Sequence, residues 1–113
     1  MLEPAEVFTE VEVQRPPHRQ ARAKAAFIGR EVDWALRFAD GYEELPGYAR
    51  VLFRSRPSDL TYVAVTVPLA DHPWLALLRR GEPVQVHGRI ADVGATSIEL
   101  KDASLLQLVE ASR

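Results

Sequence analysis

The sequence of 113 residues contains no cysteine. It therefore has no disulfide framework, no thiolate nucleophile and no cysteine ligand for a metal. It also lacks any apolar run near the roughly 20 residues that a membrane-spanning helix needs. The first residues are acidic and lack the basic and apolar regions of a signal peptide. From these absences we expect a cytoplasmic protein that has no membrane partner.

The chain also lacks a large excess of positive or of negative charge. The net charge is -2, whereas nucleic-acid-binding domains are usually basic. The charges are unevenly distributed, because residues 1–13 carry only acids, residues 14–30 only bases, and residues 31–46 mainly acids. Local potential can therefore differ from what the net charge indicates. The basic segment 15–30 fits an arm for nucleic acid or an acidic partner, and it also fits a solvated helix face paired with acids.

Groups of residues that carry catalysis or bind metals are missing as well. The histidines, His18, His72 and His87, have no metal-binding spacing. The serines lie in no recognisable nucleophile context, and the glycines form no phosphate-binding loop. The acids Asp40, Glu43 and Glu44 are expected in a solvated loop. We therefore expect a non-enzymatic protein with no metal and no cofactor.

The positive signals are those of a β-rich chain. Apolar and polar residues alternate with a period of two, which is typical of half-buried strands. The alternation predicts strands at 32–38, 48–55, 60–67, 83–92 and 96–101. In the predicted phases, Trp34, Phe38 and Phe53 point into the core. Residues 39–47 are expected to form a loop.

Helix signals occur before the first strand and after the third. Residues 17–28 are rich in alanine and are followed by Gly29, a typical C-terminal cap. After the third strand, Asp71 fits an N-cap and Pro73 a first helical turn, and Gly81 ends the helix. Residues 4–13 fit either a strand or a helix, and residues 105–109 are apolar enough to dock on the fold.

This order of elements predicts a mainly β fold. It is the order of a five-stranded OB-fold Greek-key barrel with a helix between strands 3 and 4 and an N-terminal helix. The length predicts one domain over residues 1–113. Within it we expect an N-terminal extension and helix at 1–29 and a barrel at 30–105.

Three stretches also carry a family pattern. Residues 23–32 run from a helix through Phe27 and Gly29 into a strand, residues 77–90 join a leucine-bearing helix end to a Val-x-Val-x-Gly-x-Ile strand, and residues 98–103 form a closing strand. These stretches resemble bacterial OB-fold proteins of the tRNA-anticodon-binding-like type, many of which have no known function. The resemblance implies a binding fold. The family's first strand often has a glycine midway, where this chain has Trp34-Ala35-Leu36, so its curvature needs another source.

An OB-fold usually binds its ligand on the outer face of strands 2–3. The predicted phases place cations and one clear ring on or beside that face, namely Arg37, Arg50, Arg54, Arg56, Tyr62, His87 and Arg89. Tyr42 and Tyr48, in the predicted loop, could add stacking surface. Cations that follow phosphates and rings that stack on bases are what a single-strand binder needs. We therefore expect a module that binds single-stranded DNA or RNA weakly.

A protein-interaction role is the alternative. Outward apolar residues could form a patch for a protein partner or a homo-oligomer without any nucleic-acid role. The residues of this predicted patch are Leu45, Leu52, Leu60 and Tyr62.

Overall fold

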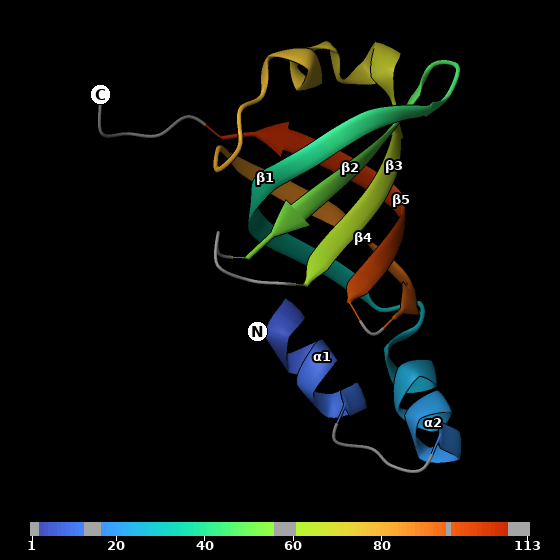
Figure 1. The fold of residues 1–113 in the computed structure, drawn as a ribbon. Helices are drawn as coiled ribbons and strands as arrows, with labels where there is room; N and C mark the ends of the chain where they lie inside the picture. Colours follow the sequence, from blue (N-terminus) through green and yellow to red (C-terminus); the bar gives the residue numbers. More distant parts are fainter. Residues whose placement is uncertain (1–2, 13–16, 56–60, 95, 109–113) are drawn as a thin grey trace.

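A computed structural model of the chain describes residues 3–12, 17–55, 61–94 and 96–108. Two helices precede five strands (Figure 1), and two short 3₁₀ helices lie between the third and fourth strands. The elements are α1 (Pro4–Glu12), α2 (Pro17–Phe27), β1 (Glu31–Leu45), β2 (Tyr48–Arg54), β3 (Tyr62–Pro68), η1 (Leu69–Asp71), η2 (Pro73–Leu77), β4 (Pro83–Val93) and β5 (Ser97–Gln107). Residues 4–12, which fitted either a strand or a helix, are helical.

The five strands close into a barrel in the order β1-β2-β3-β5-β4. All neighbouring strands are antiparallel except β3 and β5, which are parallel. This connectivity confirms the predicted OB-fold barrel. Helices α1 and α2 lie at one end of the barrel, and η1 and η2 lie at the other (Figure 1). Among the described residues, no helix combines the length and the apolarity needed to cross a bilayer.

The core confirms the strand phases that the alternation predicts. Trp34 and Phe53 are buried inside the barrel, and the half-buried Phe38 packs edge-on against Phe53 with 6.4 Å between ring centroids. Val7 of α1 and Phe27 of α2 belong to the same buried cluster. Full burial of one such side chain contributes about 1.5–3 kcal/mol. The two N-terminal helices are therefore held to the barrel by apolar contacts.

The loop predicted for residues 39–47 is wrong. Strand β1 continues to Leu45, which pairs with Tyr48 of β2. The turn is only two residues long, and its Gly47 has a φ of +83°, which glycine adopts without steric cost. Acids and glycine are poor strand formers, but pairing with a neighbouring strand outweighs such preferences. The acids Asp40, Glu43 and Glu44 therefore lie on a β-hairpin.

The bend of β1 lies after Trp34-Ala35-Leu36, the residues where the family pattern has a glycine. The pairing of β1 with β2 shifts register between Phe38 and Asp40, and such a bulge bends a strand. Gly41 follows directly, and a Cβ there would lie 3.4 Å from the Phe38 ring. The bulge and this glycine therefore let β1 bend while the barrel closes.

The connection between β3 and β4 is helical, but its details differ from the prediction. Asp71 ends η1 and caps nothing, whereas Pro73 begins η2 as expected. His72 between them is buried, and its Nδ1 lies 3.0 Å from the Pro68 carbonyl oxygen. Leu75 is buried, but Leu77 is 80% exposed.

Strand β5 extends beyond the predicted residue 101. It runs to Gln107, and Leu105 is buried opposite Val86. The apolar segment that we expected to dock from residue 105 on is therefore strand up to Gln107. Residues 109–113 lie outside the described part of the chain.

Candidate nucleic-acid interface

The outer face of β1, β2 and β3 brings together most of the predicted ligand-binding residues. Tyr48, Arg50 and Arg54 share this face because alternate residues of a strand point the same way. The strand pairing sets Tyr42 beside Arg50 and Arg37 beside Arg54. Tyr42 and Tyr48 are 51% and 46% exposed. Both rings predicted as additional stacking surface therefore lie on the same face as the arginines.

Arg54 and Tyr62 form a fixed pair on this face. The Arg54 guanidinium lies 4.7 Å from the centroid of the Tyr62 ring, and its Nη2 donates a hydrogen bond of 2.6 Å to the Tyr62 hydroxyl. Attraction between a guanidinium and an aromatic face is worth about 0.5–1 kcal/mol at exposed sites. The contact holds the cation in place, but it also occupies part of the ring surface.

A hollow of about 340 Å³ lies beside this pair. Its lining includes Arg37, Leu52, Arg54, Tyr62 and Arg80. Arg37 Nη1 donates a hydrogen bond of 3.1 Å to the carbonyl oxygen of Gly81, which ties β1 to the turn before β4. Among the described residues, the lining has three arginines and one acid, Asp40, a composition that favours an anion. Sequence patterns did not indicate Arg80, because it lies in a turn with no periodic signal.

Arg50 has an acidic partner on a strand that is not its neighbour. It forms an ion pair and hydrogen bond with Glu99 of β5. This hydrogen bond raises the pKa of Arg50 above its ordinary value, and the charge of Glu99 acts in the same direction. Since β3 lies between β2 and β5, the pair crosses the outer surface of β3. Ala64 on that surface is fully buried.

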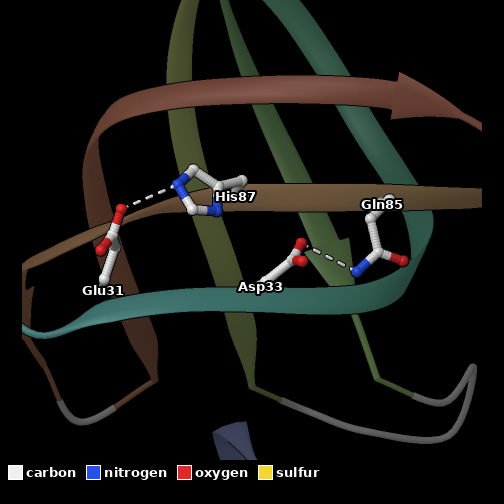
Figure 2. A network of polar contacts seen from close by, with 4 residues as sticks. All are labelled: Glu31, Asp33, Gln85 and His87. Atoms are coloured by element: carbon white, nitrogen blue, oxygen red, sulfur yellow. Dashed lines mark hydrogen bonds and ion pairs between the residues drawn. The ribbon is translucent and has the colours of Figure 1, made fainter.

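His87 and Arg89 lie on a different face of the barrel. Strand β4 neighbours β1 and β5, not β2 or β3. His87 Nε2 lies 3.1 Å from Glu31 Oε1, and nearby Gln85 donates a 2.9 Å hydrogen bond to Asp33 Oδ1 (Figure 2). Arg89 stands opposite Glu31 on one side and Lys101 on the other. These two residues are therefore separated from the group around Arg54.

The remaining predictions are only partly within the described chain. Arg56 and Leu60 lie outside the described residues, as does Arg15 of the basic segment 15–30. Leu52 and Tyr62 of the predicted apolar patch both line the hollow, whereas Leu45 lies apart from them at the hairpin turn beside Tyr48. Among the described residues, no group of three or more His, Asp or Glu side chains is placed to hold a metal ion.

Comparison with solved structures supports the fold. Two chains of asparaginyl-tRNA synthetase from Pyrococcus horikoshii, the second in complex with asparaginyl-adenylate, each align with a TM-score of 0.50. They are 16% and 14% identical to this chain, of which they cover 76% and 86%. The aligned part is only 22% and 23% of the synthetase chains. No protein-family model and no curated protein matches the sequence. At such identity the likeness shows a shared barrel fold and nothing further.

Proposed function

We propose that the protein is a cytoplasmic, non-enzymatic module that binds single-stranded nucleic acid on the outer face of β1, β2 and β3. The observation that carries this proposal is the placement of three tyrosines, Tyr42, Tyr48 and Tyr62, among arginines on one face. A single-strand site combines cations that follow the phosphates with rings that stack on the bases. OB-folds commonly bind on this face.

The same geometry predicts weak binding. Stacking contributes about 1–3 kcal/mol per base, and Tyr62 is partly covered by Arg54. Arg50 is paired with Glu99, so it adds little net positive charge. Two exposed rings and a few cations are a modest platform.

The fold neighbours support RNA as the first ligand to test. Both are chains of one enzyme that is named for tRNA, and the sequence resembles OB-fold proteins of the bacterial tRNA-anticodon-binding-like type at 23–32, 77–90 and 98–103. We therefore infer that this chain is related to OB-fold proteins of that type and that RNA is its ligand.

Fluorescence anisotropy with labelled single-stranded RNA and DNA of about 16 nucleotides tests the proposal. We expect binding at low salt that weakens as salt rises, because phosphate contacts release counterions. Arg54→Gln is expected to weaken binding, and Arg89→Gln on the other face is the matched control. Absence of binding at low salt, or equal losses in the two variants, would contradict the proposal.

A protein partner is a second candidate, favoured by the turn of the β1–β2 hairpin. Tyr42, Leu45 and Tyr48 are 51%, 60% and 46% exposed there, and aromatic residues are common in interface hot spots. Light scattering reports whether a second copy is the partner. A monomer at high concentration would contradict the homo-oligomer version. A protein that is recovered with this chain after nuclease treatment, and is no longer recovered with Leu45→Asp, would support a partner that is a different protein.

A further inference from the structure

The hollow beside Arg54 is formed by residues far apart in the sequence. Tyr62 of β3, Leu52 and Arg54 of β2, and Arg37 of β1 supply one part of the lining. Arg80 and Gly81 of the turn before β4 supply the other, and the bond from Arg37 to Gly81 holds the two parts together. The hollow is therefore a built feature of the barrel.

We propose that this hollow binds a single phosphate-bearing nucleotide, and that a free nucleoside monophosphate binds there on its own. The inference rests on the proposed nucleic-acid function and deepens it, because it names the unit that the barrel recognises.

The size of the hollow limits it to one small ligand. Its volume of about 340 Å³ is near the lower end of the range of small-molecule pockets, roughly 300–1,000 Å³. Arg50, which is paired with Glu99, is four residues from Arg54 on β2, or about 13 Å along the strand. The exposed ring of Tyr48 lies beyond that ion pair, and the exposed ring of Tyr42 lies beside Arg50. Other nucleotides of a bound strand would therefore contact a separate part of the face.

The charges of the lining favour a phosphate. A guanidinium is planar and can donate two parallel hydrogen bonds to phosphate oxygens. Arg37 is already oriented by Gly81 and Arg54 by Tyr62, so ordering them on binding costs little entropy. Arg80 is exposed on its turn and adds a third cation. Asp40, whose carboxylate accepts a 2.8 Å bond from the Gly41 amide, repels phosphate and favours the donor groups of a sugar or base at its side.

Nuclear magnetic resonance with the ¹⁵N-labelled full chain tests this inference. Adenosine 5′-monophosphate, inorganic phosphate and adenosine are titrated separately at low salt. The monophosphate is expected to shift the amide signals of Arg37, Tyr62 and Gly81, phosphate to shift a subset of them, and adenosine to bind most weakly. Absence of shifts with the monophosphate at millimolar concentration would overturn the inference.

A matched pair of variants separates a pocket from general attraction to positive charge. Arg80→Gln removes a lining cation, whereas Arg79→Gln removes the same charge from the neighbouring exposed residue outside the lining. We expect Kd for the monophosphate to rise on the order of tenfold in R80Q and to stay unchanged in R79Q. Equal weakening in both variants would overturn the pocket.

The single-strand binding assay in the same buffer distinguishes the two proposals. Oligonucleotide binding without monophosphate binding would retain the proposed function and overturn the pocket. Loss of both would overturn the proposed function and, with it, the inference.

Discussion

Arg50 on β2 and Glu99 on β5 form an ion pair that spans the outer surface of β3. The pair divides the face that we assign to nucleic acid into two parts. Tyr48 lies on one side, with Tyr42 beside Arg50 at the boundary, and the hollow lined by Arg54 and Arg80 lies on the other side. An acid on β5 thereby neutralises the arginine at the centre of the face.

Substitution of Glu99 is expected to strengthen nucleic-acid binding. Glu99→Gln removes a charge that repels phosphate and releases Arg50 to contact it. We expect affinity for a single strand to rise roughly three- to tenfold at low salt. The slope of log affinity against log salt should steepen by about one phosphate contact. Asp33→Asn on the other face makes the same change in net charge and serves as the control, and an equal gain in D33N would contradict a local effect.

The exposed tyrosines are expected to contribute stacking. Tyr42→Ala and Tyr48→Ala should each weaken single-strand binding by about fivefold or more, because a stacked base is worth about 1–3 kcal/mol. Leu45→Ala removes apolar surface at the same hairpin turn without removing a ring. Anisotropy measures all three variants, and an effect of L45A as large as that of Y42A would indicate apolar contact instead of stacking.

Gly88 is expected to allow the close approach of β5 to β4. A Cβ at Gly88 would lie 3.2 Å from the Lys101 carbonyl oxygen and 3.3 Å from Leu100 Cβ. Gly88→Ala should therefore lower the free energy of unfolding by about 1–3 kcal/mol. At Gly94 the nearest atom to an added Cβ is the Ser97 carbonyl oxygen, at 3.5 Å, so Gly94→Ala should change stability by less than about 0.5 kcal/mol. Urea denaturation compares the two, and a G94A loss equal to that of G88A would refute this account.

Phe53 is expected to be a principal core residue. It is fully buried and packs against Phe38, so Phe53→Ala should cost about 3–5 kcal/mol. Phe38→Ala should cost less, since Phe38 is only half-buried. Chemical denaturation measures both, and similar losses in the two variants would contradict the assignment.

The period of two was sufficient to predict which residues line the barrel. Val51, Phe53 and Val65 are buried, and they alternate with residues of the outer face such as Arg50, Arg54 and Thr66, because each strand has one face in the core. The same pattern failed at Asp40 and Gly41, where strand pairing overrides weak local preference. The N-cap signal failed at Asp71, which ends a 3₁₀ helix instead of capping an α-helix.

The candidate site was less predictable because strand neighbours are set by the barrel. Phase alone places Arg37, Arg54 and Tyr62 outward, which the structure confirms. It cannot show that Glu99 lies across β3 from Arg50, since this depends on the parallel pairing of β3 with β5. Phase alone also could not show which strands neighbour β4. His87 was therefore grouped with β2 and β3, whereas β4 pairs with β1 and β5.

The pairing of β1 with β4, which forms the seam where the barrel closes, also bears on the order in which the chain folds. Asp33 and Gln85, which bond across this seam, are 52 residues apart in the sequence. Contacts of such separation form slowly, because the intervening chain loses entropy before they stabilise it. The β1–β2 hairpin closes through a two-residue turn, a local event that takes microseconds. We therefore expect the strands that carry the nucleic-acid face to associate early, and the seam behind them to close last.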